Sequence, residues 1–213
     1  MTATIALLIV FAFFCGAVPF GFIAGRRKGI DLREHGSKNI GATNTLRVLG
    51  KTAGITVLLL DAVKGLIPVL LAQYALSLPP LYQVGVGLAA VLGHIYSPFV
   101  RFKGGKGVAT TLGVLIGLNP LIAAISFGVF FVTVWLTKYV SLGSILGAVT
   151  QAVLFWVLRK SGDDYALPAF GTLVALFVIA RHRANIGRLL AGTESKWGEK
   201  KGDETGAPDD APV

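Results

Sequence analysis

The sequence predicts an all-α integral membrane protein, built as a bundle of helices that cross the bilayer. Three observations lead to this prediction. Of its 213 residues, 54% are hydrophobic and 15% are charged, and the mean hydropathy is +0.70, whereas soluble domains carry about 25% charged residues. The apolar residues form runs long enough to span a bilayer. Polar loops rich in glycine, lysine and arginine separate these runs.

Seven apolar segments can be drawn along the chain. They cover about residues 3–25, 53–77, 81–97, 107–118, 120–137, 141–159 and 165–180. The fourth is the weakest, because about 12 residues rise only roughly 18 Å against a hydrocarbon core of roughly 30 Å. Asn119 and Pro120 separate the fourth segment from the fifth. Hydropathy alone therefore also allows five or six crossings.

The first segment resembles a cleaved signal peptide in its apolar length. It has no basic region before the apolar part, and Arg26, Arg27 and Lys28 follow it instead. This pattern predicts a first transmembrane helix whose N-terminus lies outside. At the other end, residues 198–213 are charged, contain prolines and show no apolar period. We expect a disordered polar tail there, after a single transmembrane domain at 1–197.

The distribution of basic residues predicts which loops face the cytoplasm. All 20 lysines and arginines except Lys64, Arg159 and Lys160 fall in loops that seven alternating crossings place on one side. By the positive-inside rule this side is cytoplasmic, with the N-terminus outside and the C-terminus inside. The formal net charge of +9 is then explained by membrane orientation, so we expect no nucleic-acid partner.

The first of three polar clusters on this side is GSKNIGATNTLR, residues 36–47. The side chains that can line a polar pocket are Ser37, Asn39, Thr43 and Asn44. Arg47 can clamp a phosphate with two parallel hydrogen bonds. The same residues can instead form a capped interfacial helix with solvated side chains.

The second cluster, GHIYSPFVRFKGGKGVATT at 93–111, is a glycine-rich cationic loop. Its charges and turns come from Arg101, Lys103, Gly104, Gly105, Lys106 and Gly107. We expect backbone N–H groups here, and the positive end of a helix starting at Val108, to face an anion. A Walker A loop is excluded, because glycine follows Lys106 where that motif needs serine or threonine. The alternative is a flexible turn whose charges only set the topology.

The third cluster is RHRANIGRLLAGTE, residues 181–194, directly after the last segment. Helical spacing can direct His182 and Asn185 to a common site. Glu194 can pair with an arginine and hold the segment in place, which is a structural role. The alternative is a basic helix that only stops translocation. Ser141 adds a hydroxyl on the same side, and it can instead cap the sixth helix.

Two ionisable residues, Asp61 and Lys64, lie inside the second segment at i and i+3 on one helix face. Such residues are costly in lipid and face protein or water. They therefore serve either a functional site or a buried ion pair that fixes helix packing. His94 presents a similar choice, between contact with an anion and a structural hydrogen bond.

Signatures of covalent or metal chemistry are missing from the sequence. There is no GxSxG motif, and none of His35, His94 and His182 is followed five residues later by aspartate, as an H-x4-D acyltransferase requires. No histidine or carboxylate cluster has metal-ligand spacing, so we expect no metal. Cys15 is the only cysteine, which excludes an intramolecular disulfide and suggests a packing role.

Taken together, GSKNIGATNTLR, GHIYSPFVRFKGGKGVAT and RHRANIGRLLAGTE resemble the three cytoplasmic motifs of the bacterial PlsY family, the acyl-phosphate-dependent glycerol-3-phosphate acyltransferases. The resemblance runs from Ser37 to Glu194, and three ordered motifs are far more specific than one. It implies a compact bundle of seven transmembrane helices in the bacterial inner membrane, with the active site on the cytoplasmic side. One departure is Lys38, where the family commonly has glycine.

The resemblance also implies transfer of a fatty acyl group from acyl phosphate to the 1-hydroxyl of glycerol 3-phosphate, giving lysophosphatidic acid and phosphate. A substrate phosphate oxygen assists deprotonation of the hydroxyl, so neither a protein nucleophile nor a cofactor is expected. Expected partners are the two substrates and membrane lipid, and the expected state is a monomer. Catalytic roles are implied for Ser37, Arg47, Lys106, His182 and Asn185. Substrate-binding roles are implied for Asn39, Thr43, Asn44, Lys103, Gly104, Gly105, Gly107, Thr110 and Ser141, and structural roles for Asp61, Lys64 and Glu194.

The main rival is a transporter for an organic phosphate, which the intramembrane Asp61 and Lys64 suggest. Transporters place their site near the midplane, between repeated halves. Here the cationic clusters collect at one surface, and no internal repeat is visible. The sequence therefore favours an enzyme over a transporter.

Overall fold

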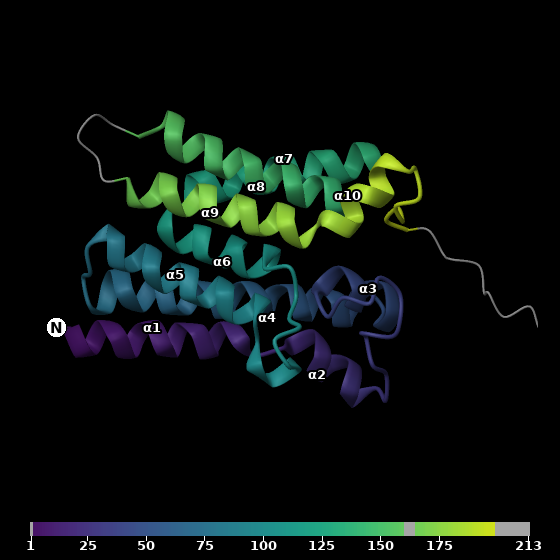
Figure 1. The fold of residues 1–213 in the computed structure, drawn as a ribbon, viewed down its shortest axis with the longest axis horizontal. Helices are drawn as coiled ribbons and strands as arrows, with labels where there is room; N and C mark the ends of the chain where they lie inside the picture. Colours follow the sequence, from purple (N-terminus) through teal and green to yellow (C-terminus); the bar gives the residue numbers. More distant parts are fainter. Residues whose placement is uncertain (1, 160–164, 199–213) are drawn as a thin grey trace, which may run out of the picture.

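The computed structural model describes residues 2–159 and 165–198, and every regular element within these ranges is helical. The long helices are α1 (Thr2–Ala17), α4 (Lys51–Leu70), α5 (Pro80–Ile95), α6 (Val108–Leu118), α7 (Pro120–Thr137), α8 (Val140–Val157) and α9 (Ala166–Arg181). The short ones are α2 (Phe20–Arg27), α3 (Ala42–Leu49) and α10 (Arg183–Leu190), with a π-helical turn η1 (Leu71–Ala75) and a 3₁₀ turn η2 (Pro98–Val100). The long helices run side by side along the longest axis of the molecule (Figure 1). The expected disordered tail, apart from Gly198, lies outside the described residues.

All seven apolar segments are helical in the structure, and their ends differ from the expected ones by a few residues. Among the described residues, five helices are long and apolar enough to cross a membrane, and a sixth is counted if the bent pair of α9 and α10 is one span. The fourth segment, α6, is short, as expected. The all-α prediction is confirmed for the described residues, while the count of seven crossings stays a prediction.

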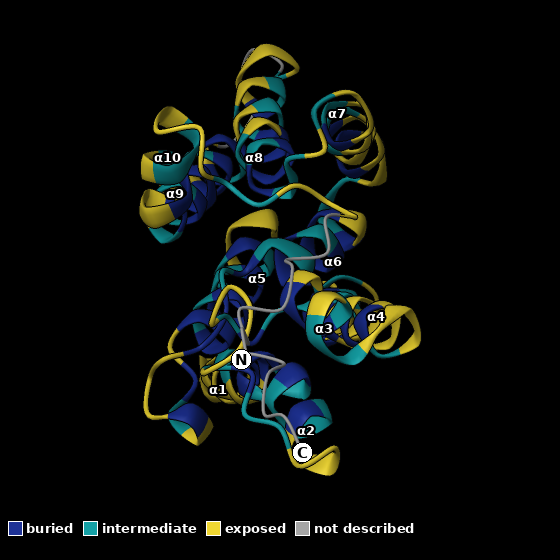
Figure 2. Ribbon diagram, turned by 90° about the vertical axis from the view of Figure 1, so that its right-hand side faces the viewer, coloured by how far each residue is buried: buried dark blue, intermediate teal, exposed yellow. Residues whose placement is uncertain are grey.

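The helices form two groups that enclose one apolar core. In the first group α1 packs on α5 and α4 on α6, while in the second α8 packs on both α7 and α9. Contacts between α6 and α7 and between α5 and α9 join the groups (Figure 2). Large apolar side chains such as Leu7, Trp135 and Val157 lie outside and are 62–71% exposed. Such an outer surface matches lipid as the surrounding medium.

The first apolar segment is broken rather than continuous, which corrects the single helix expected over residues 3–25. Pro19 has no N–H and its ring disfavours helix continuation, so α1 ends at Ala17 and α2 starts at Phe20. The break frees two carbonyl groups inside the bundle. Ser97 Oγ donates to the carbonyl of Ala17 at 2.6 Å, and Lys64 Nζ donates to that of Val18 at 2.7 Å.

Asp61 and Lys64 form a buried ion pair, with Nζ 2.6 Å from Oδ1 and side chains that are each 3% exposed. The ring of His94 approaches the same carboxylate, with Nδ1 3.8 Å from Oδ1. The ion-pair interpretation is therefore the one that the structure shows. Because Val18 also binds Lys64, the pair ties α4 to the break between α1 and α2.

The loops that carry the basic residues gather at one end of the bundle. This end holds α2, α3 and α10 together with the loop at 101–107 (Figure 1). The alternation of segments predicts this arrangement. Successive helices run in opposite directions, so every second loop lies at the same end of the bundle. Which side of a bilayer this end faces stays a prediction.

Lys38 occupies backbone space that favours glycine, because its φ is 58°. A side chain there costs roughly 1–2 kcal/mol, against roughly 0.5–1 kcal/mol of extra chain entropy for glycine. We predict that Lys38→Gly stabilises the protein by about 0.5–1 kcal/mol, seen as a higher midpoint of thermal unfolding in detergent. Lys28→Gly is the matched control, because Lys28 has φ −102° and gains nothing from glycine. A lower midpoint for Lys38→Gly would refute the strain.

Candidate functional site

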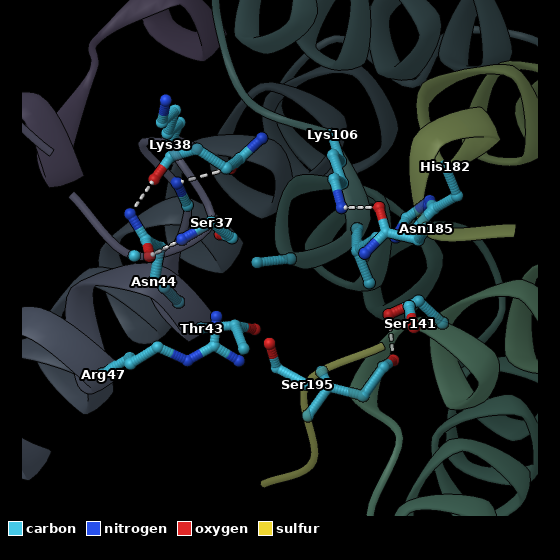
Figure 3. Close-up of a pocket in the computed structure, with 18 of the residues that line it drawn as sticks. Ser37, Lys38, Thr43, Asn44, Arg47, Lys106, Ser141, His182, Asn185 and Ser195 are labelled. Atoms are coloured by element: carbon cyan, nitrogen blue, oxygen red, sulfur yellow. Dashed lines mark hydrogen bonds between the residues drawn. The ribbon is translucent and has the colours of Figure 1, made fainter. Parts of the chain in front are cut away.

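A polar cavity of about 420 Å³ opens between the two helix groups, at the end where the basic loops gather. The residues of the predicted site that line it are Ser37, Asn39, Thr43, Asn44, Arg47, Asp61, Lys106, Gly107, Ser141, His182, Asn185 and Glu194. Figure 3 shows the first-cluster residues on one wall and Lys106, Ser141, His182 and Asn185 on the other. The structure therefore brings all three polar clusters to one cavity.

Asn44 organises the wall made by the first cluster. Its side chain is buried, and Nδ2 donates to the carbonyl oxygens of Leu32, His35 and Asn39 at 3.1, 3.0 and 2.8 Å. Its Oδ1 accepts from the backbone N–H of Ser37 at 2.8 Å. With all of these bonds made within the chain, Asn44 shapes the loop that presents Ser37.

Arg47 follows Thr43 by one helical turn of α3, so both reach the cavity. Within the described residues its guanidinium forms no hydrogen bond or ion pair. In Figure 3 it extends from α3 toward Ser195. No side chain caps α3, which begins after Gly41, so the alternative of a capped interfacial helix is wrong in that detail. Arg47 is thus available for a ligand.

Gly104 and Gly105 seat the glycine loop on the end of α5. Their N–H groups donate to the carbonyls of Ile95 at 3.1 Å and His94 at 3.2 Å. A Cβ atom on Gly105 would overlap Nε2 of His94, so only glycine fits there. The expectation that these N–H groups face an anion is therefore wrong.

The opposite side of the loop is held by Arg181. Its Nη2 donates to the carbonyl oxygens of Gly104 and Gly105 at 3.1 and 3.3 Å. With its backbone held from both sides, the loop presents the next residue, Lys106, to the cavity. Gly104 and Gly105 thus contribute to the site by fixing the shape of the loop that carries Lys106.

Lys106 donates from Nζ to Oδ1 of Asn185 at 2.5 Å, which links the second cluster to the third. Burial lowers the pKa of Lys106 to about 8, and neighbouring arginines push in the same direction against the opposing charge of Glu194. The helix beside it starts at Val108, as predicted, after Gly107 with φ 83°. Val108 also lines the cavity, so the positive end of α6 adds to the charge of Lys106.

Glu194 joins the third cluster to α8. It accepts hydrogen bonds from Ser141 Oγ at 2.6 Å, Asn185 Nδ2 at 2.6 Å and Arg188 Nε at 2.7 Å. Burial raises the pKa of the Glu194 carboxyl, but these hydrogen bonds lower it by more, so the carboxylate stays charged. The expected pairing with an arginine is confirmed. The suggestion that Ser141 caps its helix is wrong, because the cap position of α8 is Tyr139.

His182 occupies the junction where α10 turns by 61° from α9. Its Nδ1 lies 2.8 Å from the carbonyl oxygen of Val178. Since a carbonyl can only accept, Nδ1 carries the proton, and Nε2 of the neutral ring is an acceptor. The bend places Asn185 beside Lys106, which helical spacing alone does not do.

Some predicted residues do not line the cavity. Lys103 is exposed on the loop, Thr110 is buried toward α4, and Lys64 lies beneath the cavity behind Asp61. Other residues line it without having been assigned a role: Lys38, His94, Ser144, Arg188 and Ser195. Arg188 follows Asn185 by three residues in α10, and this spacing indicates that both side chains lie on the same face of the helix.

The charges favour binding of an anion. Asp61 is paired with Lys64, and Glu194 with Arg188. Lys38, Arg47 and Lys106 also line the cavity, and these carboxylates do not match their charge. Over the described ranges, no group of three histidine, cysteine, aspartate or glutamate side chains is placed to hold a metal ion.

An apolar cavity of about 430 Å³ adjoins the polar one. It lies among α4, α6, α7 and α8. The two cavities share the lining residues Ala42, Thr43, Leu58, Val108, Ala109, Phe130, Val140 and Ser144. A ligand with an anionic head and an apolar tail fits this pair of spaces.

Fold and site together define a multi-pass membrane protein with adjoining polar and apolar cavities in its helical bundle. Comparison with known proteins supplies the family. Residues 6–192 match the family described as glycerol-3-phosphate acyltransferase. A relative of that name from Fusobacterium nucleatum is 47% identical over 190 residues, covering 89% of this chain and 96% of its own. One from Acholeplasma laidlawii is 40% identical over 220 residues, covering 92% and 94%.

A solved structure agrees with these sequence matches. The crystal structure of PlsY, an integral membrane glycerol 3-phosphate acyltransferase in its glycerol 3-phosphate form, superimposes with a TM-score of 0.86 at 40% identity. It covers 92% of this chain and 96% of its own. The chain therefore belongs to the glycerol-3-phosphate acyltransferase family, and it is an acyltransferase of phospholipid synthesis.

Proposed function

We propose that the protein transfers a fatty acyl group from acyl phosphate to the 1-hydroxyl of glycerol 3-phosphate, giving lysophosphatidic acid and inorganic phosphate. The observation that carries this proposal is that the cationic cavity and the apolar cavity adjoin and share lining residues. Both substrates bear a phosphate, and only one bears a fatty chain. The apolar cavity holds that chain, and the polar cavity holds both phosphates.

The similar structures support the proposed acceptor and product. Structures of PlsY have been solved in a glycerol 3-phosphate form and a lysophosphatidic acid form, the latter with a TM-score of 0.83 to this chain. In the present chain, Arg47 and Lys106 reach the polar cavity from opposite walls. They bring together two phosphates that otherwise repel each other.

The chemistry requires no protein nucleophile. The oxygen of the 1-hydroxyl attacks the acyl carbonyl carbon, and the bond from this carbon to the phosphate oxygen breaks. The hydroxyl proton passes to a phosphate oxygen, so inorganic phosphate leaves with it. Nε2 of His182 accepts a hydrogen bond from the acceptor molecule, while Ser37 and Asn185 orient the phosphates.

The membrane arrangement follows from the same site. We infer that the first segment and α4 to α9 cross the bacterial inner membrane, seven crossings in all, with the basic end in the cytoplasm. The acyl chain then lies at the depth of the lipid tails. The phosphates stay at the cytoplasmic surface, where glycerol 3-phosphate is supplied.

The donor is tested with purified protein in detergent. Palmitoyl phosphate should release inorganic phosphate only when glycerol 3-phosphate is present, with lysophosphatidic acid identified by mass spectrometry. Acyl-CoA should not replace the donor, and a chelator should have no effect. Phosphate release that ignores the acceptor would refute the proposal, as would counterflow of glycerol 3-phosphate in liposomes without acylation.

The lowered pKa of Lys106 predicts a pH dependence of substrate binding. Its ammonium group is charged below pH 8 and loses the charge as the pH rises through about 8. The KM for glycerol 3-phosphate should therefore rise by up to about fivefold between pH 8 and pH 9, because the charged fraction of Lys106 falls by about that factor. Lys106→Arg keeps the charge over this range, so its KM should stay flat. A parent KM that is equally flat would contradict this role for Lys106.

A further inference from the structure

Three polar atoms without a hydrogen-bond partner belong to residues that line the apolar cavity, and each of these atoms is itself buried. They are Thr111 Oγ1, Ser126 Oγ and Gln151 Oε1, and none of them forms a hydrogen bond within the described part of the chain. All three residues line the apolar cavity. Their exposed fractions are 5%, 5% and 1%. We refer to these three residues as the polar belt.

The polar belt lies at one level of the bundle. Helices α6 and α7 are antiparallel and meet at Asn119, with Thr111 eight residues before it and Ser126 seven after it. At 1.5 Å of rise per residue, their heights differ by only about 2 Å. Gly147 of α8 packs against the backbone of Ser126, because a Cβ atom built on Gly147 would lie 3.1 Å from the carbonyl oxygen of Ser126. Gln151 follows Gly147 by one helical turn, so it lies about one turn from the level of Ser126.

The belt residues of α7 and α8 differ from the other polar residues of these two helices. Thr133 and Ser144 each donate to the carbonyl one turn earlier, at 2.7 and 2.9 Å. Ser126 makes no such bond. The amide of Gln151 is held by its Nε2, which donates to the carbonyl of Gly171 at 2.8 Å, while its Oε1 has no partner. Buried polar atoms are normally satisfied, so these point to a bound group.

We propose that the polar belt binds a hydroxyl or similar oxygen substituent on the acyl chain, which makes oxygenated acyl groups substrates of the enzyme. This inference rests on the proposed function, since the apolar cavity must hold the chain. The hydroxyls of Thr111 and Ser126 can donate, and Oε1 of Gln151 can accept. A chain hydroxyl needs one partner of each kind.

The position of the substituent follows from the helices. Thr111 lies two residues beyond Ala109, and Ser126 lies one turn from Phe130, where Ala109 and Phe130 line both cavities. Thr111 and Ser126 are therefore about 3–6 Å beyond the polar cavity. This depth corresponds to the half of a palmitoyl chain that is nearer to the carbonyl group.

The test compares palmitoyl phosphate with a series of palmitoyl phosphates that carry one hydroxyl at successive carbons. We expect kcat/KM to peak at one or two adjacent positions in the half nearer to the carbonyl, within about threefold of the plain donor. At other positions a buried hydroxyl has no partner, and kcat/KM should fall by about tenfold or more.

Substitutions in the polar belt test whether it causes the peak in kcat/KM. In Ser126→Ala and Thr111→Val the peak should fall by about tenfold, with use of the plain donor kept within about twofold. Thr150→Val is the control, because Thr150 does not line the cavity and its hydroxyl bonds to Leu146. A flat profile, or a peak that survives both variants, would overturn the inference. Failure to use even the plain donor would instead refute the proposed function.

Discussion

Lys106→Ala should lower kcat/KM for glycerol 3-phosphate by on the order of 100-fold, and the protein should stay folded. The substitution removes a buried positive charge from the polar cavity, where a preorganised cation stabilises developing negative charge. It also leaves Oδ1 of Asn185 without its donor. Steady-state kinetics with palmitoyl phosphate and a thermal unfolding curve measure the two effects separately.

Lys103→Ala is the matched control for this prediction. Lys103 belongs to the same loop and carries the same charge, but it is exposed and does not line the cavity. Its activity should stay within about twofold of the parent. If both variants lost activity equally, the general positive charge of the loop would be responsible and Lys106 would have no special role.

Lys64→Met should destabilise the protein by about 3–5 kcal/mol, because it leaves the carboxylate of Asp61 buried without its cation. It also removes the donor to the carbonyl of Val18 at the break between α1 and α2. The double variant Asp61→Leu with Lys64→Met removes both charges. It should recover most of the lost stability, as thermal unfolding in detergent would show.

The control here is Lys51→Met, at the exposed start of the same helix, which should change stability by less than about 0.5 kcal/mol. A Lys64→Met protein as stable as the parent would contradict the ion pair. The activity of the double variant then answers a second question. Asp61 lines the polar cavity, so a stable but inactive double variant would place the pair among the functional groups.

Local patterns predicted the elements of this fold well. Apolar runs marked every long helix, and α6 begins at Val108, where the glycine loop ends. The loops alternate between the two ends of a bundle, so the positions of lysine and arginine predicted that the polar clusters would meet. Ser37, Lys106 and His182 do line one cavity. These features depend on the order of residues along the chain.

Other features depend on which atoms meet across the bundle. The glycines at 104 and 105 were expected to present N–H groups to an anion, but these groups bond to the end of α5. Asn44 was expected at a ligand, but its side chain is used by its own loop. In both cases a polar group has several possible partners, and only the packed chain decides among them.

The break at Pro19 and the polar belt are two further features that the sequence does not predict. Averaged hydropathy over residues 3–25 hides one proline, and nothing near Val18 in the sequence indicates that Lys64 will bind its carbonyl. Ser126 and Gln151 are two of several polar residues in α7 and α8, and nothing in the sequence indicates that they line one cavity. Apolar periodicity follows from each segment's need to bury its surface in lipid or protein. Hydrogen-bond partners follow from tertiary contacts between residues far apart in the chain, which the packing of the helices alone determines.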